Sequence, residues 1–486
     1  MKLKDLVANL YPRLPSQFEE FDVEQISCDS RQVKPQSLFV AVPGITYDGA
    51  NFIDEAIDKG AIVVAYDHHA AKKINNDQVC ALQVSDPKRF LHEIIQRFYD
   101  YPSKKVKTIG VTGTNGKTTI TYLIESVFKT NDKRCAVIGT INHRIAGNII
   151  PSKNTTPGVV ELQQYLFEMD KAKVAYCVME VSSHALEQER VAGIDFRSAI
   201  FTNLTQDHLD YHVYMDNYFY AKAKLFTALS ADSYALINTD DHFARKLIGL
   251  TKSRVMTYGI KNQADIQARD IHLTLRGSTF TVCDQPGRTK IQTRLMGTHN
   301  IYNILAAWGV CLSEGISPEN IKKGIEAFDS VPGRLERIDC GQDFFVYVDY
   351  AHTDDALKNV LTSFKQVSSA KVIVVFGCGG NRDKMKRPKM GEVASQLADY
   401  VIVTSDNPRQ EDPQAIIGEI IAGFKGNHYA VVLDRKEAIA KAFSLVQKGE
   451  IVLIAGKGHE DYQIFKDKTI HFDDREIARE CLQCLV

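Results

Sequence analysis

The stretch Val106-Lys-Thr-Ile-Gly-Val-Thr-Gly-Thr-Asn-Gly-Lys-Thr-Thr119 decides the fold of this chain. Its first half, Val106–Val111, is rich in apolar and β-branched residues, which predicts a buried strand. A helical pattern then runs from Lys117 to Lys129. Between the two, Gly113 and Gly116 let the backbone approach an anion closely, and a helix N-terminus favours negative charge. The sequence therefore predicts a phosphate-binding loop between a strand and a helix.

The residue types of this loop suit a nucleotide. We expect Lys117 to reach the β- and γ-phosphates and the Thr118 hydroxyl to bind Mg²⁺. The usual GxxxxGK[ST] pattern has a glycine where this chain has Val111, so the match is a variant. The alternative is a glycine-rich β–α turn with an incidental lysine. The predicted nucleotide-binding residues of the loop are Gly113, Thr114, Asn115, Gly116, Lys117, Thr118 and Thr119.

Strand-like and helical patterns alternate along most of the chain. After the loop, apolar runs at Ala175–Glu180 and Ser198–Thr202 alternate with helical patterns at Val159–Asp170 and Asp216–Leu229. Such alternation predicts an α/β protein with a doubly wound, mostly parallel sheet. We expect three domains. They are a small N-terminal α/β domain at 1–103, a central phosphate-loop domain at 104–335, and a Rossmann-like C-terminal α/β domain at 336–486.

Composition argues against several classes of protein. A formal net charge of −1 and a pI of about 6.9 give no basic footprint for nucleic acid. The N-terminus has no secretory apolar run, and no apolar stretch has the length of a bilayer span. The ten cysteines, with one CxxC at Cys481 and Cys484, are typical of free thiols in a reducing compartment. We expect a cytoplasmic monomer that binds neither nucleic acid nor a membrane.

Polar residues follow two further predicted strands. Glu180 ends one strand, and His208 lies in the segment Thr202–His212 after the next. Because carboxyl ends of parallel strands share one edge of a sheet, both should lie near the phosphate loop, where a carboxylate suits Mg²⁺. A nucleotide-dependent switch is the alternative from another class. The chain has no Asn-Lys dipeptide, so the base-reading segment of such a switch is missing.

Seven motifs occur in order along nearly the whole chain. They are GTNGKTT at Gly113–Thr119, EVSSH at Glu180–His184, NLTQDHLDYH at Asn203–His212, YFYAKAKLF at Tyr218–Phe226, GTHNIYN at Gly297–Asn303, PGRLE at Pro332–Glu336 and DYAHT at Asp349–Thr353. This set closely resembles the Mur ligase family, and within it the members that add the third amino acid of the peptidoglycan precursor. The resemblance implies one domain for the UDP end of the substrate, one for ATP, and a mobile C-terminal domain for the amino acid.

The resemblance also implies roles for single residues. Lys222 matches the family's carbamylated lysine, and carbamylation turns a cation into an anionic oxygen ligand suited to Mg²⁺; Lys224 would be a bystander. The implied catalytic residues are Lys117, Glu180, His208 and Lys222, and the implied metal ligands are Thr118, Glu180, His208 and Lys222 as its carbamate. The implied nucleotide contacts outside the loop are Asn300, Arg334 and Asp349.

For the UDP-linked substrate, the resemblance points to Ser30 and to the segment Gly44–Gly49 at the UDP end. The residues implied at the dipeptide end are Asn154, Thr155, Thr156, Ser182, Gln188 and Arg190. One departure from the family pattern is visible, since Asp354 follows DYAHT where the family usually has proline. Proline there would rigidify a turn, so we expect the change to affect the local backbone rather than the chemistry.

Arg409 indicates which amino acid is added. It lies in Asp406-Asn-Pro-Arg409, just after a predicted strand. A guanidinium pairs with a carboxylate through two hydrogen bonds, and diaminopimelate differs from lysine by one carboxylate. The Asp-Asn-Pro-Arg form resembles that of the diaminopimelate-adding members. The residues implied in this pocket are Arg382, Asp406, Asn407, Pro408, Arg409, Gly456 and Glu460.

Together these inferences predict an ADP-forming ligase that adds meso-diaminopimelate to the D-glutamate of UDP-N-acetylmuramoyl-L-alanyl-D-glutamate. The D-glutamate carboxylate would attack the γ-phosphate of ATP, and the amine would then attack the acyl phosphate. His208 or the Lys222 carbamate would assist removal of the amine proton. Two ligases stay as alternatives. The L-lysine-adding relative is disfavoured by Arg409, and a folylpolyglutamate-type ligase needs neither the Ser30 segment nor the turn at Asp406–Arg409.

Overall fold

The structure is a computed structural model that describes residues 1–11, 14–44, 47–67, 74, 77–285 and 287–484. The chain forms two compact units. The first contains Met1–Lys117 and Asp132–Met256, and the second contains Thr118–Asn131 and Thr257–Val486. Each unit carries parallel sheet covered by helices, which confirms the predicted α/β class.

The N-terminal part of the first unit is a parallel sheet with the strand order β1-β2-β3-β4. One apolar cluster packs α1 and α3 on one face, and a second packs α2 on the other. Because side chains alternate along a strand, Val63 faces the first cluster and Val64 the second. The elements are α1 (Leu3–Leu6), β1 (Gln25–Ser27), β2 (Ser37–Val40), α2 (Ile53–Asp58), β3 (Ala61–Asp67), β4 (Cys80–Val84) and α3 (Pro87–Phe98).

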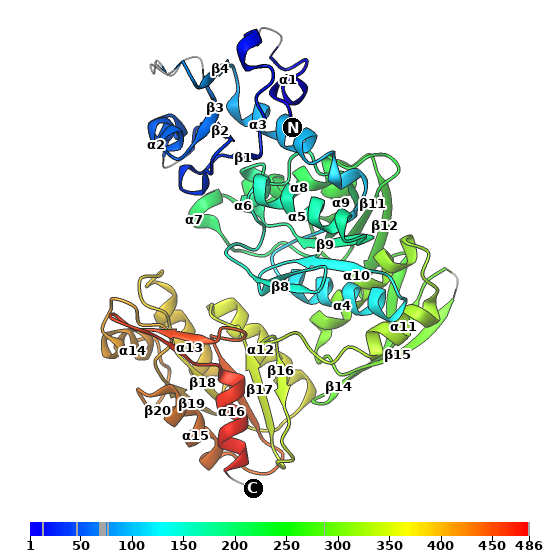
Figure 1. Ribbon diagram of the computed structural model, residues 1–486. Coiled ribbons are helices and arrows are strands. Elements are labelled where there is room, and N and C mark those ends of the chain that lie inside the picture. The colour runs from blue at the N-terminus through cyan, green and yellow to red at the C-terminus, as the bar shows by residue number, and fades with distance from the viewer. Residues whose placement is uncertain (12–13, 45–46, 68–73, 75–76, 286, 485–486) are drawn as a thin grey trace. The chain divides into compact units, whose positions relative to one another are not determined.

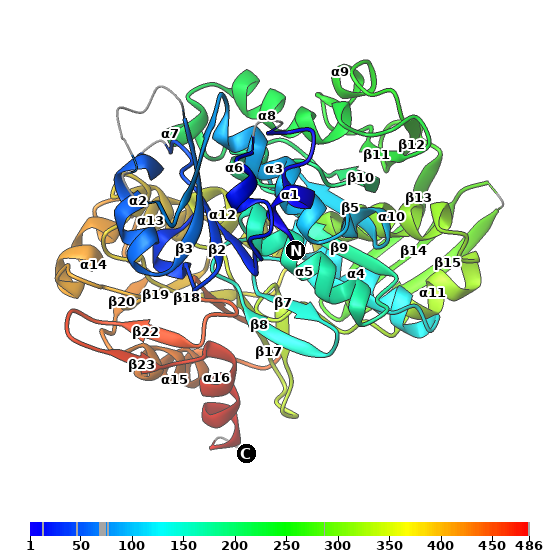
Figure 2. The same ribbon diagram turned by 45° about the horizontal axis from the view of Figure 1, so that its top comes forward.

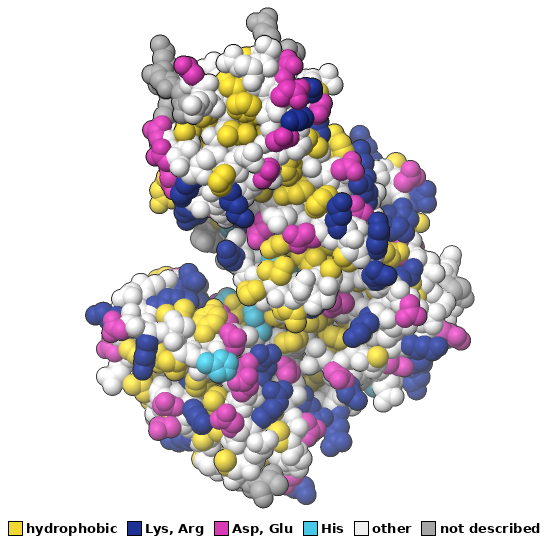
Figure 3. All heavy atoms as spheres, viewed as in Figure 1, with side chains coloured by type: hydrophobic (Ala, Val, Ile, Leu, Met, Phe, Trp, Pro, Cys, Tyr) yellow, Lys and Arg dark blue, Asp and Glu magenta, His cyan; other side chains and the backbone are white. Residues whose placement is uncertain are grey.

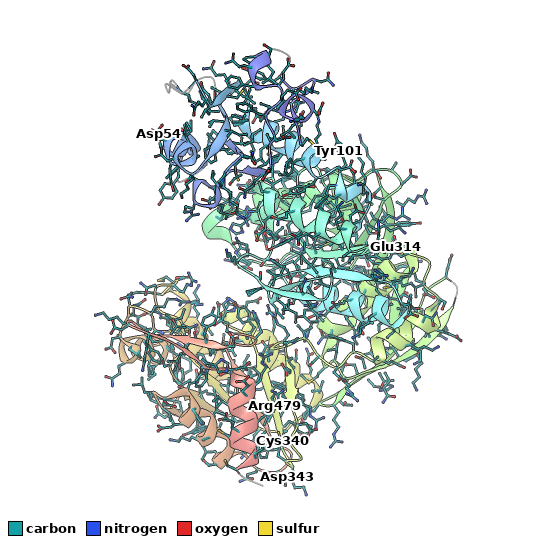
Figure 4. The ribbon with its side chains drawn as sticks, viewed as in Figure 1. Asp54, Tyr101, Glu314, Cys340, Asp343 and Arg479 are labelled. Carbon is teal, nitrogen blue, oxygen red and sulfur yellow. The ribbon has the colours of Figure 1, made fainter. Side chains whose placement is uncertain are left out.

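Helix α3 shows why the sequence folds locally in this way. Asp86 caps its N-terminus by accepting from the Arg89 N–H, and Pro87 stands at the first helical position, where it needs no N–H donor. The buried residues Phe90, Leu91, Ile94 and Ile95 then form one stripe. Tyr101, labelled in Figure 4, follows this helix and precedes a short 3-10 turn at Pro102–Lys104.

The rest of the first unit carries seven neighbouring strands of an 11-stranded sheet, in the order β11-β10-β5-β9-β6-β7-β8. The strands from β11 to β6 are parallel, and β7 and β8 form an antiparallel hairpin. Its elements are β5 (Lys107–Thr112), β6 (Cys135–Ile138), β7 (Asn142–Ile145), β8 (Asn148–Pro151), α5 (Val159–Lys171), β9 (Tyr176–Glu180), α6 (Ser183–Glu187), β10 (Phe196–Phe201), α7 (Leu209–His212), α8 (Met215–Thr227), β11 (Tyr234–Asn238) and α9 (Ala244–Ile248).

Strand β5 lies between β10 and β9, at the point where the strand order reverses. The chain leaves β5 toward β6 on one side and later returns on the other side as β10. Loops diverge at such a switch point, so the carboxyl ends of β5 and β10 leave room for a ligand. The predicted phosphate loop follows β5, between Thr112 and the first residue of α4 (Lys117–Thr130).

The second unit continues with antiparallel strands and two helices. Strand β12 (Arg254–Gly259) crosses the unit boundary, and its last residues pair in parallel with β13 (Ile266–Thr274). The antiparallel strands β14 (Gly277–Cys283) and β15 (Arg288–Thr293) follow. Helix α10 (Thr298–Ser313) is buried along most of its length, ends before Glu314 (labelled in Figure 4), and is followed by α11 (Pro318–Glu326).

A six-stranded sheet with the order β16-β17-β21-β18-β19-β20 completes the second unit. Only β16 runs antiparallel to its neighbour. Helices α12, α13 and α14 pack on one face, and α15 and α16 pack on the other (Figure 1). Its elements are β16 (Glu336–Ile338), β17 (Phe345–Asp349), α12 (Asp354–Val367), β18 (Val372–Phe376), α13 (Lys386–Leu397), β19 (Tyr400–Val403), α14 (Pro413–Ile421), β20 (Tyr429–Val431), α15 (Arg435–Leu445), β21 (Ile451–Ala455) and α16 (Asp474–Gln483).

Two smaller features accompany this sheet. The hairpin of β22 (Tyr462–Ile464) and β23 (Thr469–His471) lies outside the main sheet (Figure 2). Arg479 of α16, labelled in Figure 4, donates to Glu336 Oε1 at 3.2 Å and ties α16 to β16.

The Asp354 departure has a structural answer. Asp354 is the first residue of α12, and Thr353 caps the helix by accepting from the Ala356 N–H. Proline and aspartate both suit the first turn of a helix, the former by its fixed φ and the latter by its charge. The position is therefore a helix start rather than the rigid turn we expected, and the exchange preserves the backbone.

In the part of the chain that the structure describes, no helix has the length and apolarity to cross a membrane. All ten cysteines are free, as expected. On the face shown in Figure 3, basic and acidic side chains lie interspersed among the described residues.

Candidate active site

The phosphate loop is fixed to the carboxyl end of β10. The Asn115 N–H donates to Asn203 Oδ1 at 3.0 Å, and Thr202 Oγ1 donates to Asn115 O at 2.7 Å. Gly113 has φ +144° and Gly116 φ +90°. A Cβ on Gly113 would lie 1.8 Å from Thr202 Oγ1, so only glycine fits there. The strand, the glycines and the neighbouring strand end therefore hold one loop conformation before any ligand arrives.

Two lysine side chains converge on this loop. Lys117 Nζ donates to Gly113 O at 2.9 Å and to Thr114 O at 2.8 Å, and Lys222 Nζ donates to the same Gly113 O at 2.9 Å. Lys222 is 2% exposed. Burial and the nearby Lys117 charge hold the pKa of Lys222 well below its ordinary value, against a smaller opposing effect of Asp207. Two cationic side chains on one carbonyl form a site that favours an anion, or the neutral form of one amine.

Glu180 is held in a fixed orientation at the end of β9. Its neighbour on β5 is Val111, so the carboxylate lies beside the phosphate loop as predicted. The Thr140 N–H donates to Glu180 Oε1 at 2.8 Å, and Thr140 Oγ1 donates to Oε2 at 3.0 Å. A Cβ on Gly139 would lie 2.5 Å from Oε1, so the chain passes directly against the carboxylate. This buried anion is ordered by the loop after β6.

His208 follows β10 on the predicted edge and is exposed. Its φ is +53°, and its ring meets the ring of His184 edge-on at 4.9 Å between centroids. His212, also in contact with His184, is buried against Ser183 Oγ at 2.9 Å, and burial lowers its pKa. Among the described residues, no three His, Cys, Asp or Glu side chains form a metal-binding group.

Four of the six residues predicted at the dipeptide end form one hydrogen-bonded group. Arg190 donates to Thr156 O at 2.9 Å and to Gln188 Oε1 at 2.6 and 2.9 Å. Ser182 N–H donates to Thr156 Oγ1 at 3.1 Å, and the Ser182 hydroxyl caps α6. Thr155 reaches Thr140 at 3.1 Å between hydroxyls. Asn154, by contrast, accepts through its carbonyl from the Ser152 hydroxyl at 2.9 Å and makes no hydrogen bond with this group among the described residues.

Ser30 lies elsewhere in the first unit. Its hydroxyl donates to Glu55 Oε2 at 2.8 Å, and its carbonyl accepts from Lys59 at 3.2 Å. A ligand on Ser30 would therefore have to compete with the Glu55 carboxylate. The segment Gly44–Gly49 lies partly outside the described residues.

Of the predicted nucleotide contacts in the second unit, Asn300 and Asp349 are buried and Arg334 is half-buried. Asn300 donates to Met296 O at 2.9 Å and accepts from Asn303 at 3.0 Å. Arg334 lies over the Tyr350 ring at 4.6 Å, and its Nε is buried with no hydrogen-bond partner among the described residues.

Asp349, at the end of β17, is also buried. It accepts from the Leu335 N–H at 2.6 Å and from the Ala351 N–H at 2.9 Å. Burial raises its pKa, against the opposing effect of Arg334 and of these two hydrogen bonds. Asp349 therefore joins the segment that follows Arg334 to the carboxyl end of β17.

The turn Asp406–Arg409 is an ordered structure at the end of β19. Asn407 Nδ2 donates to Glu460 Oε2 at 3.0 Å, and the Ile464 N–H of β22 donates to Asn407 Oδ1 at 2.9 Å. A Cβ on Gly456 would lie 3.1 Å from Asp406 Oδ2. Burial raises the pKa of Glu460, and Lys457 opposes this effect. Asp406, Asn407, Gly456 and Glu460 thus lie close together, and their role in binding an amino acid stays a prediction.

Arg409 itself has φ +54°, a conformation that a non-glycine residue adopts only when its surroundings impose it. Its Nη1 donates to Gly380 O at 2.9 Å and to Asn407 O at 3.5 Å. Among the described residues, no carboxylate lies within 4.0 Å of this guanidinium. Arg382 lies exposed on the loop that contains Gly380.

Sequence reasoning missed three residues that build the site. Thr140 holds Glu180, Asn203 holds the phosphate loop, and Lys457, which is fully buried, lies 3.5 Å from Glu460. Lys457 had a readable signal, because it stands between glycines just after a buried strand. Thr140 had none, since its role depends on the pairing of β6 with β9.

Family models match most of the chain. Residues 22–99 match the model described as Mur ligase family, catalytic domain, and residues 111–311 match the Mur ligase middle domain. Residues 333–458 match the Mur ligase, glutamate ligase domain. The three matches follow one another in a three-domain order.

Full-length relatives carry one name. The chain is 42% identical over 485 residues to "UDP-N-acetylmuramoyl-L-alanyl-D-glutamate--2,6-diaminopimelate ligase 1" of Clostridium acetobutylicum, with 99% of each chain covered. It is 42% identical over 489 residues to the ligase of the same name, without the final numeral, from Syntrophomonas wolfei, again with 99% of each covered. A solved structure of a ligase with that name has a TM-score of 0.73 and 32% identity, and covers 100% of this chain and 99% of its own.

Proposed function

The chain belongs to the Mur ligase family and is a ligase, and from this premise we propose that it uses ATP to join meso-diaminopimelate to UDP-N-acetylmuramoyl-L-alanyl-D-glutamate. The bond formed is an amide between the D-glutamate side-chain carboxylate and one amine of the diamino acid. The names of the full-length relatives support both substrates. The geometry of two sites in this chain supports the two halves of the reaction.

The first half is activation of the carboxylate at the phosphate loop. A carboxylate oxygen attacks the γ-phosphorus of ATP, the bond to the bridging oxygen breaks, and ADP leaves with that electron pair. Lys117 would exchange its bonds to Gly113 O and Thr114 O for phosphate oxygens, and so neutralise charge on the transferring group. Asn300, Arg334 and Asp349 would hold the adenine and ribose side. This role of the three residues is part of the proposal.

The residues around the loop fit Mg²⁺. Bound Mg²⁺ would neutralise phosphate charge and orient the phosphate oxygens. Glu180 is buried, ionisable and held by Thr140, which is the state of a prepared ligand. The lowered pKa of Lys222 favours the neutral amine, which can add CO₂ and release one proton to become a carbamate. Thr118 and His208 would complete the ligand set.

The second half is attack by the amine on the acyl phosphate. The amine nitrogen bonds to the acyl carbon, the carbon–oxygen bond to phosphate breaks, and phosphate leaves. The amine must lose one proton, and His208 or the Lys222 carbamate would accept it. Asp406 and Glu460 would hold the other ammonium group of the diamino acid, at the end that remains unreacted. The group Thr156, Ser182, Gln188 and Arg190 would hold the dipeptide.

One observation carries the choice of amino acid. The Arg409 guanidinium is held by two carbonyl oxygens and has no carboxylate within 4.0 Å among the described residues. Diaminopimelate supplies such a carboxylate. Lysine has the same terminal ammonium but no carboxylate on that carbon, so it would leave the Arg409 guanidinium without its partner. Arg409 would therefore attract one amino acid and reject the other.

The test is a ligase assay with ATP, Mg²⁺ and the UDP-dipeptide, run with meso-diaminopimelate and with L-lysine. Product mass and phosphate release are measured. We expect turnover with diaminopimelate, and Arg409→Ala should lower its kcat/KM by about 10²-fold or more. Lys436→Ala, at an exposed pair with Glu480 in the same sheet domain, is the control and should change nothing. Equal turnover of lysine, or an unchanged Arg409→Ala, would refute the choice of amino acid.

A further inference from the structure

Two loops at the carboxyl ends of neighbouring strands are joined by backbone contacts. We call residues 377–385, after β18, the glycine loop, and residues 404–412, after β19, the arginine turn. The Gly380 N–H donates to Asn407 O at 2.9 Å, and Arg409 Nη1 donates to Gly380 O at 2.9 Å. The position of the Arg409 side chain therefore depends on the glycine loop.

Arg387 lies beneath this junction with no exposed surface. Its Nη1 donates to Glu411 Oε2 at 2.9 Å and to Glu419 Oε2 at 2.8 Å. Its Nη2 donates to Glu411 Oε1 at 3.0 Å and to Gly379 O at 3.2 Å. Glu411 Oε1 also accepts from the Asn381 N–H at 2.5 Å. One buried guanidinium thus reaches the glycine loop directly through a carbonyl and indirectly through Glu411.

The two glutamates differ in what else they bind. Glu411 uses both oxygens, one of them shared between Arg387 and the loop amide of Asn381, and it belongs to the arginine turn. Glu419 lies on α14 and meets Arg387 through one oxygen. An arginine that only anchored α13 to α14 would need Glu419 and not the bonds to the loops. The contacts to Gly379 and Glu411 point to a role in shaping the loops.

We propose that Arg387 is a positioning residue for the amino-acid substrate, which fixes the glycine loop through Gly379 O and Glu411 and so sets the place of Arg409. The proposal rests on the proposed function, because Arg409 matters only if it binds a substrate carboxylate. Arg387 touches no substrate. Its loss should weaken amino-acid binding and discrimination against lysine, while the phosphate loop keeps its ATP chemistry. A lysine cannot replace it, since one ammonium lacks the planar fork that reaches four acceptor oxygens on three residues.

The test compares Glu411→Gln with Glu419→Gln in the full-length protein. A glutamine at 411 would turn an N–H group toward a donor, either Arg387 or Asn381, whereas at 419 its single oxygen can still accept from Arg387. We expect Glu411→Gln to raise KM for diaminopimelate about tenfold, with kcat and the KM for ATP within about twofold of the parent. Glu419→Gln should leave all three within about twofold, and Arg387→Gln should behave as Glu411→Gln.

A double-mutant cycle decides whether Glu411, which links Arg387 to the glycine loop, acts through Arg409. In the Arg409→Ala background, Glu411→Gln should raise KM no further, because the side chain it positions is gone. Additive effects would overturn the proposal, and so would equal effects of the two glutamine variants. The cycle does not use an Arg387 variant. It therefore still decides the question if Arg387→Gln fails to fold.

Hydrogen exchange separates this proposal from the proposed function. Amides of residues 378–385 should exchange about tenfold faster in Glu411→Gln and at the parental rate in Glu419→Gln. If the parent protein fails to use diaminopimelate, the proposed function is refuted. Arg387 then has no role in substrate specificity either. If the parent uses it and exchange rises without a change in KM, only the positioning role is refuted.

Discussion

Exchange of Lys222 for methionine should make the protein more stable and inactive at once. Methionine has a similar length and no charge, so the packing around a side chain that is 2% exposed is preserved. Gly113 O keeps a hydrogen bond, because it also accepts from Lys117. The substitution therefore removes one buried amine and leaves no acceptor unpaired.

The magnitude follows from the contacts of Lys222 Nζ, which among the described residues has one hydrogen-bond acceptor, Gly113 O, and lies 4.4 Å from the centroid of the Tyr218 ring. An amine buried with one carbonyl acceptor leaves donors unsatisfied, which costs about 1–3 kcal/mol. Removing that cost should raise the melting temperature by roughly 2–4 °C for each kcal/mol recovered in a domain of this kind. Loss of the carbamate should lower kcat by about 10²–10³-fold, equivalent to roughly 3–4 kcal/mol of transition-state stabilisation.

The effect has a defined sign with pH. The pKa of Lys222 is lowered in the folded state from 10.5, so the unfolded chain binds the extra proton between the two values. Stability of the parent should therefore rise with pH across that window and reach its full value above 10.5. The stability advantage of Lys222→Met should shrink as pH rises through it, measured by thermal melts of the nucleotide-free protein.

Lys224, two residues along α8, supplies the matched control. It is exposed and pairs with Glu187, so Lys224→Met should keep its activity. Lys222→Ala should be inactive and should regain part of its activity with a small carboxylic acid, which can replace the carbamate oxygens. The reasoning is refuted if Lys222→Met keeps activity within tenfold of the parent, or if it melts below the parent at neutral pH.

Three further predictions concern single contacts. Gly113→Ala should abolish ATP binding in calorimetry and lower the melting temperature, because its Cβ would lie 1.8 Å from Thr202 Oγ1. Gly158→Ala is the control, since nothing lies within 4 Å of a Cβ there. Equal behaviour of the two variants would contradict the argument about the phosphate loop. Thr140→Val should raise the Mg²⁺ concentration for half-maximal rate about 10–100-fold, with recovery in Thr140→Ser, and an unchanged Mg²⁺ titration would separate Thr140 from the metal. Arg435→Met should lower the free energy of unfolding in urea by about 3–5 kcal/mol, since it leaves Asp474 buried and unpaired. The double variant Arg435→Met with Asp474→Leu should recover most of this loss. A single variant as stable as the double variant would show that the ion pair is not needed.

The sequence was sufficient where function depends on consecutive residues. The predicted strand, loop and helix correspond to β5, the phosphate loop and α4, and Glu180 lies at the predicted edge. These positions can be predicted from the sequence because the spacing of apolar residues and the conformation of glycine depend on neighbouring residues only.

It was insufficient where structure depends on distant partners. The hairpin of β7 and β8 mixes polar and apolar residues without a strict alternation. It turns at Ala146 and Gly147, both with positive φ, and this pair is a weaker turn signal than Asn-Gly. The bond from Ser30 to Glu55 joins residues far apart in the chain, and so does the fork of Arg387. Such contacts are set by tertiary packing, which a single sequence does not display.

The neighbouring order of β21, β18 and β19 has a consequence for how this enzyme type can change. The residues predicted to choose the amino acid follow the ends of these three strands, in the loops that carry Gly456, Gly380 and Arg409. The phosphate loop and Glu180 follow strands of a different sheet. The residues proposed to select the amino acid therefore lie on a different sheet from the phosphate loop and Glu180, although Asp349, a proposed nucleotide contact, ends β17 beside β21. On these proposed roles, the choice of building block for the cell wall depends on three adjacent loops and leaves the phosphate loop unchanged.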